Sequence, residues 1–260
     1  MICAGIDAGS RAIKVVLLDS EGLKVLASGR ADQGVEQEAL ALHLLERTLE
    51  DSGLSRADIN RTVATGYGRN IIGFADATIT EITCHACGVR HVVPDAKTII
   101  EIGGQDSKLI RLNARGAVRD FAMNDRCAAG TGRFLEVVAA RLEVDLDELG
   151  EMARGSRTPA SISSTCVVFA ETEIIGLLAA GSRPEDIVAG VQRSIASRVS
   201  AMGGRSMEPP VVFTGGVALV PGMDAAFQFT LGQPVTIARQ PMMTGALGAA
   251  LLACRTQDRI

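Results

Sequence analysis

The sequence predicts an α/β fold of two similar lobes that face each other. Three observations support this prediction: an opening strand–turn–strand unit with an acid–x–glycine turn, a second copy of that unit starting at Ile99, and a strand from Val211 that ends in two glycines. Turns of this kind present backbone N–H groups to phosphate oxygens, and the nearby acids suit a hydrated Mg²⁺. The same features therefore predict a nucleotide site.

The first unit begins with "ICAGID" and "KVVLLD", which flank a Gly-Ser turn, and "LKVLAS" follows as a third strand. Residues 36–51 carry leucines on one side of a predicted helix, which Gly53 ends. "RTVATG" is predicted as a short strand. "ATITEITCHACGVRHVV" is predicted as a helix over residues 77–93, which stops before Pro94.

The second unit, "IIEIGGQDSKLIRLNARG", aligns with "GIDAGSRAIKVVLLDSEG" at a constant offset. Any two hairpins with glycine turns resemble each other to some degree. We favour a true duplication because four positions match in register, which is more than turn chemistry requires. The matched pairs are Asp7 with Glu101, Gly9 with Gly103, Lys14 with Lys108, and Gly22 with Gly116.

The third element is "VVFTGGVALVPGM", a strand, a Gly-Gly turn and then a helix. Without Cβ atoms, Gly215 and Gly216 let a nucleoside lie against the backbone. Glycine also ends strands for purely structural reasons. As the third part of a set, the turn supports the nucleotide interpretation.

The composition excludes several classes of protein. Only 3% of the residues are aromatic and none is Trp, which argues against recognition of nucleic acid by base stacking. The formal charge of −4 argues against a polyanion-binding surface. No apolar run is long enough to span a membrane and no signal-peptide region is found, so we expect a cytoplasmic protein. In the cytoplasm its cysteines should be reduced; they are Cys3, Cys84, Cys87, Cys127, Cys166 and Cys254.

Two of these cysteines share a setting. Cys127 in "NDRCAAGTGRFLE" and Cys166 in "SISSTCVVFAE" each stand where a helix is predicted to begin. A helix N-terminus carries free N–H groups and partial positive charge, which stabilise a bound anionic species. The alternative is a buried, inert cysteine at each place. Two thiolates per chain are too few for an iron–sulfur cluster, which usually needs four.

The other cysteines are given structural interpretations. "TCHACGVRH" places Cys84, Cys87 and His91 at the spacing of a metal site, but only one such group exists and the stretch reads as continuous helix. We therefore interpret it as helix rather than as a metal site. Cys3 and Cys254 lie among apolar residues and are predicted to fill the core.

Taken together, "GIDAGSRAIK", "ATGYGRN", "EIGGQDSK", "MNDRCAAGTGRFLE", "ISSTCVVFAE", "FTGGVA" and "GALGAAL" resemble a known family from about Ala4 to Ala253. The hairpins and the Gly-Gly turn resemble the actin, Hsp70 and sugar kinase (ASKHA) ATPase fold. The cysteine motifs resemble those of ATP-dependent activators of 2-hydroxyacyl-CoA dehydratases, a family that also contains ATP-binding subunits of benzoyl-CoA reductases.

The resemblance implies an ATPase coupled to one-electron transfer. It implies a homodimer that binds ATP and Mg²⁺ and shares one 4Fe–4S cluster, held by Cys127 and Cys166 of each subunit. The electron would come from ferredoxin or flavodoxin and pass to a dehydratase or reductase. A small-molecule kinase and a nucleotide-gated assembly protein of the same fold are the alternatives. The lobes are expected at residues 1–94 and 95–242, with a helix over residues 243–260 that packs back on the first.

Residues of both hairpins are assigned to the nucleotide. Gly9 and Ser10 are expected to offer N–H groups to phosphate, and Lys14 to add charge or to be a solvated strand residue. Asp7 is the candidate that holds Mg²⁺ through water. Arg11 stands where related loops often carry Thr or Ser, which leaves fewer side-chain hydroxyls for the phosphates.

In the second hairpin, Gly103 and Gly104 match the phosphate loop, and Gln105 is the candidate that orients the attacking water. Glu101 stands where many relatives have Asp, so its metal contact is expected to be longer or bridged by water. Asp106 is a weaker candidate for Mg²⁺. No residue is assigned as a general base.

Overall fold

The structure is a computed structural model that describes residues 1–204 and 207–255. The chain forms two compact units. Unit 1 contains residues 1–96, 112–119 and the described part of the chain after residue 237, and unit 2 contains residues 97–111 and 120–237. The last part of the helix predicted over residues 243–260, residues 256–260, lies outside the described residues.

Unit 1 is built on a five-stranded sheet of order β3-β2-β1-β4-β5. Strand β1 is antiparallel to β2 and parallel to β4, and β2 is antiparallel to β3. The predicted opening meander and the short fourth strand are therefore confirmed. The strands are β1 (Ile2–Ala8), β2 (Ala12–Asp19), β3 (Lys24–Asp32), β4 (Ile59–Thr65) and β5 (Ala77–Thr78).

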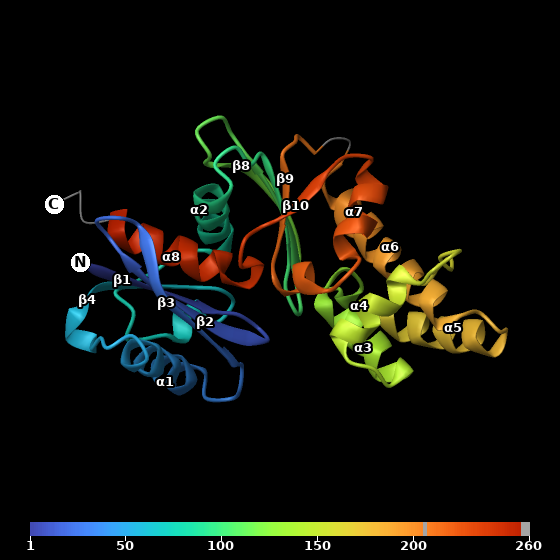
Figure 1. Cartoon of the computed structure of the whole chain (residues 1–260), viewed down its shortest axis with the longest axis horizontal. Helices are drawn as coiled ribbons and strands as arrows, with labels where there is room; N and C mark the ends of the chain where they lie inside the picture. Colours follow the sequence, from blue (N-terminus) through green and yellow to red (C-terminus); the bar gives the residue numbers. More distant parts are fainter. Residues whose placement is uncertain (205–206, 256–260) are drawn as a thin grey trace. The chain divides into compact units, whose positions relative to one another are not determined.

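Helices cover both faces of this sheet (Figure 1). Successive side chains of a strand point to opposite faces. Accordingly, Val15 and Leu17 pack with Leu44 and Leu45 of α1 (Gln37–Glu50). On the other face, Val16 and Leu18 pack with α8 (Thr244–Arg255), whose small residues allow close packing. The sheet is thus buried on both sides, and the predicted first helix is confirmed.

The helix predicted over residues 77–93 is shorter than expected. Ala77 and Thr78 form β5, and the helix is α2 (Glu81–Val92). The Thr80 side chain accepts a hydrogen bond from the N–H of Thr83, which fixes the helix start there. The prediction was therefore wrong at its beginning, because a threonine cap and an edge strand precede the helical run.

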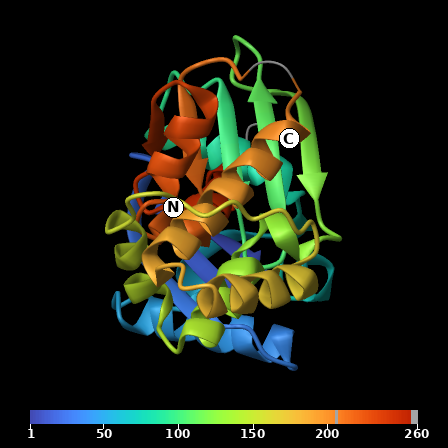
Figure 2. The ribbon, with the colours of Figure 1, turned by 90° about the vertical axis from the view of Figure 1, so that its right-hand side faces the viewer.

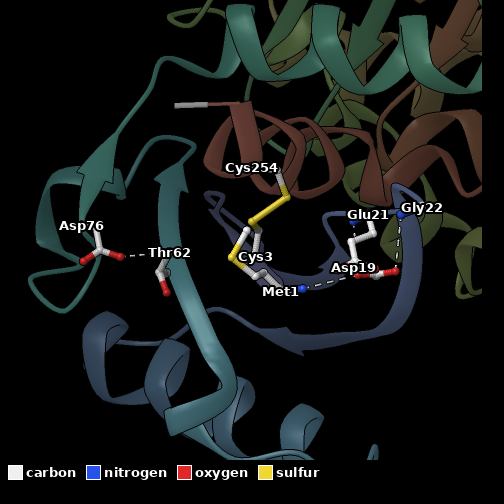
Figure 3. Close-up of a disulfide and its surroundings, with 8 residues drawn as sticks. All are labelled: Met1, Cys3, Asp19, Glu21, Gly22, Thr62, Asp76 and Cys254. Atoms are coloured by element: carbon white, nitrogen blue, oxygen red, sulfur yellow. Dashed lines mark hydrogen bonds and ion pairs between the residues drawn. A yellow bond between two sulfur atoms is a disulfide. The ribbon is translucent and has the colours of Figure 1, made fainter. Parts of the chain in front are cut away.

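A disulfide joins the two ends of unit 1. Cys3 of β1 and Cys254 of α8 are bonded across a sequence separation of 251, with 5.7 Å between their Cα atoms (Figure 3). Cys3 is fully buried, as predicted. The expectation that all six cysteines are reduced is wrong for this pair, because packing of α8 on β1 brings the two thiols together.

Unit 2 repeats this plan with a five-stranded sheet of order β10-β9-β6-β7-β8. The central strand β6 is antiparallel to β7 and parallel to β9, as β1 is to β2 and β4. The predicted duplication is therefore present in the sheet topology. The strands are β6 (Thr98–Ile102), β7 (Ser107–Leu112), β8 (Val118–Asn124), β9 (Val211–Thr214) and β10 (Val235–Ile237).

The core of unit 2 is formed by residues of its sheet and of its helices, among them Ile102, Phe134, Val191, Phe213 and Phe227. Figure 2 shows the sheet and the helices from a second side. The helices are α3 (Gly132–Leu142), α4 (Leu146–Arg154), α5 (Val167–Ala179), α6 (Pro184–Met202) and α7 (Met223–Leu231). Over residues 1–204 and 207–255, no helix combines the length and apolar character needed to cross a membrane.

Candidate nucleotide loops and cysteine pair

The first hairpin places an acid opposite a lysine. Asp7, at the end of β1, pairs in register with Lys14 of β2, and the Lys14 Nζ lies 3.0 Å from the Asp7 Oδ2. The Asp7 side chain is buried and that of Lys14 is partly buried. A buried carboxylate needs such partners. Lys14 is therefore an ion-pair residue of the hairpin rather than a solvated strand residue.

The second hairpin repeats this pair and adds a second acid. Glu101 of β6 pairs in register with Lys108 of β7, whose Nζ lies 2.7 Å from the Glu101 Oε2 and 2.7 Å from the Asp106 Oδ2. Burial alone would lower the pKa of Lys108, but the two carboxylates outweigh it and raise that pKa above its ordinary value. Lys108 is thus held charged between Glu101 and Asp106. The first hairpin has no second acid, because the position that matches Asp106 is Ala12 there.

The glycine N–H groups assigned to phosphate are used to close the turns. The N–H of Gly9 donates to the Ala12 carbonyl (3.1 Å), and the N–H of Gly103 donates to the Asp106 carbonyl (3.0 Å). Among the described residues, no acceptor is found for the N–H groups of Ser10, Gly104 or Gln105. The donors that each loop offers to a ligand are therefore the N–H groups beyond the first glycine.

Sequence reasoning missed a matching feature at the ends of β4 and β9. Thr65 pairs with Asp7, and Thr214 pairs with Glu101, in the same parallel register. The next residues, Gly66 (φ +88°) and Gly215 (φ +89°), have positive φ, and a Cβ at Gly215 would lie 2.8 Å from the Glu101 Oε1. Only glycine fits this conformation beside the acid. The shared "TG" that ends both strands is the signal that would have found the pair.

A buried histidine lies near the first acid and was also missed. The Nδ1 of His85, on α2, is 3.0 Å from the Oγ1 of Thr244, the first residue of α8. A Cβ on the next residue, Gly245, would lie 3.2 Å from both the Asp7 Oδ2 and the His85 Nε2. These residues are distant in the sequence, so no local pattern predicts that they meet.

Cys127 is exposed but does not begin a long helix. It precedes a single 3-10 turn, Ala128–Gly130, and α3 begins at Gly132 with Thr131 as its cap. The amide of Asn124 donates to the Cys127 carbonyl (2.7 Å) and accepts from its N–H (3.0 Å). The prediction that Cys127 sits at a helix start therefore holds only for this short turn, because the hydroxyl of Thr131 caps the longer helix.

Cys166 is exposed at the N-terminus of α5, as predicted, and the loop before it is tied down. The Glu173 carboxylate accepts from the N–H and hydroxyl of Ser163 (2.9 and 2.7 Å) and from the N–H of Ser164 (2.8 Å). Arg198 of α6 donates to the Ser164 carbonyl (2.7 Å). Desolvation opposes it, but these serine hydrogen bonds lower the pKa of Glu173 to about 2.

The helix that follows Cys166 has an apolar surface in contact with solvent. Val168 and Phe169 are each 69% exposed, and Ile175 is 40% exposed. Only Ala170 and Ile174 of α5 are buried. Exposed apolar surface of this kind marks interaction sites. The surface formed by Val168, Phe169 and Ile175, beside Cys166, is called the α5 face below.

The remaining thiols are divided between core and surface. Cys84 is buried, and burial raises the pKa of its thiol to about 12. Cys87 and His91 lie further along α2 and line a pocket of unit 1. Among the residues that the structure describes, no three His, Cys, Asp or Glu side chains are grouped so as to hold a metal ion. One chain alone therefore offers Cys127 and Cys166 as two thiol ligands and no complete set.

Two mixed sheets of one strand order, each with an acid and a glycine at the same register positions, define an ATPase of the actin, Hsp70 and sugar kinase class. A ROK family glucokinase from Streptomyces griseus, solved with glucose and AMPPNP, has a TM-score of 0.61 at 12% identity and covers 98% of this chain and 100% of its own. At this identity the likeness shows the fold alone. The predicted ASKHA fold is confirmed.

The family follows from closer relatives. Residues 4–253 match the BadF/BadG/BcrA/BcrD ATPase family, and the chain belongs to this family. The activator of lactoyl-CoA dehydratase from Anaerotignum propionicum is 46% identical over 258 residues, which cover 97% of each chain. The activator of the 2-hydroxyisocaproyl-CoA dehydratase from Clostridium difficile, solved with bound ADPNP, has a TM-score of 0.93 at 42% identity and covers 100% of this chain and 98% of its own.

A component of a benzoyl-CoA reductase is a more distant relative. This polypeptide of the Thauera aromatica reductase is 31% identical over 275 residues, covering 100% of this chain and 95% of its own. The resemblance stated from the motifs, to dehydratase activators within a family that includes benzoyl-CoA reductase subunits, is therefore confirmed.

Proposed function

We propose that this chain is the ATP-dependent activator of a 2-hydroxyacyl-CoA dehydratase, in which ATP hydrolysis is coupled to one-electron transfer within a homodimer. Higher identity to a dehydratase activator (46%) than to the reductase component (31%) supports the dehydratase partner. The observation that carries the proposal is the exposed pair Cys127 and Cys166, the second of them beside the exposed α5 face.

The donor set fits a 4Fe–4S cluster only when two chains combine. Each chain supplies two exposed thiols, whereas such a cluster usually takes four. A two-fold dimer doubles every residue, so Cys127 and Cys166 of both subunits would complete the set. The α5 face would then be covered by the second copy. When bound, the cluster supplies the low-potential electron.

The two hairpins would bind the nucleotide. Asp7 would hold a hydrated Mg²⁺, with the Lys14 ion pair orienting its carboxylate. The N–H groups of Ser10, Gly104 and Gln105 suit phosphate oxygens, and the exposed Gln105 side chain would orient the attacking water. Glu101 shares Lys108 with Asp106, whereas Asp7 has Lys14 as a separate partner, so we assign Glu101 a metal contact through water at most. Gly215 and Gly216 would lie against the nucleoside.

The second phosphate loop is directly connected to the segment that carries Cys127. The N–H of Gly132 donates to the Gly103 carbonyl (2.9 Å), and the N–H of Arg133 donates to the Gly104 carbonyl (2.8 Å). The first turn of α3 is thereby attached to the loop. A nucleotide that repositions this loop would move α3 and the turn after Cys127.

Kinase activity on a small molecule is less well supported. It requires a catalytic base in a substrate pocket but no exposed cysteine pair, and the identity to a kinase of this fold is only 12%. We expect the activator to work in the cytoplasm with ferredoxin or flavodoxin as its reductant, and without nucleic acid or membrane partners.

Substitution of the cysteines tests the proposal. Cys127→Ser and Cys166→Ser should each leave a folded protein that has lost the brown colour and iron found after anaerobic purification of the wild type. Cys87→Ser is the matched control, because Cys87 lies on α2 of unit 1 and should leave the iron content unchanged. Iron near four atoms per dimer in either of the first two variants would contradict the ligand assignment.

A further inference from the structure

The pocket lined by Cys87 and His91 lies in unit 1, where α2, the end of α8 and the turn of residues 113–117 meet. Its volume is about 550 Å³, within the range typical of small-molecule sites. Arg90 of α2, Arg115 of the turn and Arg255 of α8 line it, together with the apolar side chains of Ala86 and Leu252. None of these residues belongs to the hairpin loops or to the cysteine pair.

The turn is held against Arg90 by local geometry. Gly116 has a φ of +78°, and a Cβ there would lie 2.5 Å from the Arg90 Nε, so the backbone passes directly over the guanidinium. The Asn113 side chain accepts the N–H groups of Arg115 (2.9 Å) and Ala117 (3.1 Å) and fixes the turn. The fixed conformation of this turn therefore places Arg115 and Arg90 at the same pocket.

The pocket has a concentration of positive charge. Its ionisable lining residues are the three arginines, Cys87 and His91, and no carboxylate of the described residues lines it. None of the ion pairs found among residues 1–204 and 207–255 involves Arg90, Arg115 or Arg255. Burial raises the pKa of the Cys87 thiol, against the opposing charge of Arg255, so the thiol adds no negative charge. Three guanidiniums in one pocket, with no carboxylate of the described residues paired to them, stand out in a chain of net charge −4.

This combination selects a class of ligand. Guanidinium groups bind phosphate oxygens through paired N–H donors, and three of them can serve more than one phosphate. The wall of Ala86 and Leu252 suits an apolar or heterocyclic group attached to those phosphates. We propose that the pocket binds a phosphorylated small molecule, a nucleotide or a coenzyme A compound, with its phosphates at Arg90, Arg115 and Arg255. This inference does not depend on the proposed function.

Binding measured by calorimetry on the anaerobically purified protein tests the inference. The protein is first given one equivalent of Mg-ADPNP per chain, and then pyrophosphate, ADP or coenzyme A is titrated. We expect one further equivalent per chain to bind. The Arg90→Gln/Arg115→Gln double variant should weaken this second binding by at least about tenfold, since it removes charge-assisted hydrogen bonds to phosphate. Comparison of ADP with coenzyme A shows which source of phosphate the pocket prefers.

The control is Arg30→Gln/Arg47→Gln, which removes the same charge from exposed positions of unit 1 outside the pocket. This control should bind the second equivalent as the wild type does. Absence of any second equivalent in the wild type would overturn the inference. Equal weakening in both double variants would also overturn it, because it would show a general effect of net charge. Circular dichroism confirms that both double variants are folded.

Discussion

At the scale of the residue, the two hairpins are organised by buried ion pairs. Asp7 with Lys14, and Glu101 with Lys108, occupy the same register positions of two sheets. Breaking a buried pair leaves an uncompensated charge, which is far more costly than losing a surface pair. The pairs therefore explain why the acid and the lysine recur together, and the first of them orients the Asp7 carboxylate where Mg²⁺ is proposed to bind.

Asp7→Asn should impair Mg-dependent ATP hydrolysis. The amide is neutral and holds a hydrated metal less well, so we expect a lower rate and a higher Mg²⁺ requirement. Hydrolysis measured over a range of Mg²⁺ concentrations checks this, with Asp32→Asn, at an exposed strand end, as the matched control. Wild-type rates with an unchanged Mg²⁺ dependence would show that the metal is held elsewhere.

The residues that were predictable are those with a local pattern. A seven-residue spacing across a tight turn places Asp7 opposite Lys14, so the sequence alone indicates the pair. His85 and Thr244 are 159 residues apart, and the Cys3–Cys254 disulfide spans 251. Contacts of this kind depend on how α8 packs on β1 and α2, and no local spacing encodes that packing.

At the scale of the element, a helix begins later than the sequence prediction where a threonine further along the chain caps it. Thr80 starts α2 later than its apolar run suggests, and Thr131 starts α3 five residues after Cys127. By contrast, α5 begins directly after Cys166, because the loop before it is tied to Glu173 of the same helix. The prediction of a helix start is therefore accurate at Cys166 and less accurate at Cys127.

Glu173→Gln should loosen the loop that precedes Cys166. A neutral amide accepts the Ser163 and Ser164 hydrogen bonds less strongly, so we expect hydrogen exchange at those two amides to rise about fivefold. Exchange followed by mass spectrometry or NMR checks this, with Glu171→Gln as the control on the same helix. Unchanged protection of both serine amides in Glu173→Gln would show that Arg198 alone holds the loop.

The same contact predicts a pH dependence. The pKa of Glu173 is lowered from 4.5 to about 2, so its stabilisation of the loop is fully present above pH 4.5. It should be lost as the pH falls from 4.5 towards 2, and exchange protection at Ser163 and Ser164 should fall in that window. Glu173→Gln cannot titrate and should lack this part of the pH dependence.

At the scale of the whole molecule, the chain contains two sheets of the same strand order, and in unit 2 the loop after β6 is hydrogen-bonded to α3. Both sheets share one strand order, and the repeated motifs made this predictable from the sequence. The attachment of α3 to the Gly103–Gly104 loop was not predictable, because backbone hydrogen bonds between a loop and a later helix leave no residue signature. That attachment joins the proposed phosphate loop to the Cys127 segment within unit 2.

Mg-ATP should therefore change the accessibility of the iron that the cysteine pair is proposed to hold. A ligand can shift a conformational equilibrium only by its differential affinity for the two states, and the loop bonded to Gly132 and Arg133 is where phosphate is proposed to act. Iron loss to a chelator should proceed at a different rate with Mg-ATP than without nucleotide. Asp32→Asn should behave as the wild type, and Asp7→Asn should respond less to Mg-ATP.

Electron delivery should depend on nucleotide for the same reason. With the protein reduced beforehand, reduction of the proposed dehydratase partner should still require Mg-ATP, and Mg-ADPNP should support at most a single turnover because it is not hydrolysed. Stopped-flow absorbance of the activator and the partner measures both steps. Transfer at one rate with and without nucleotide would show that motion of the Gly103–Gly104 loop does not govern the cysteine pair, and the chain would then be an iron–sulfur electron carrier on an ATPase fold.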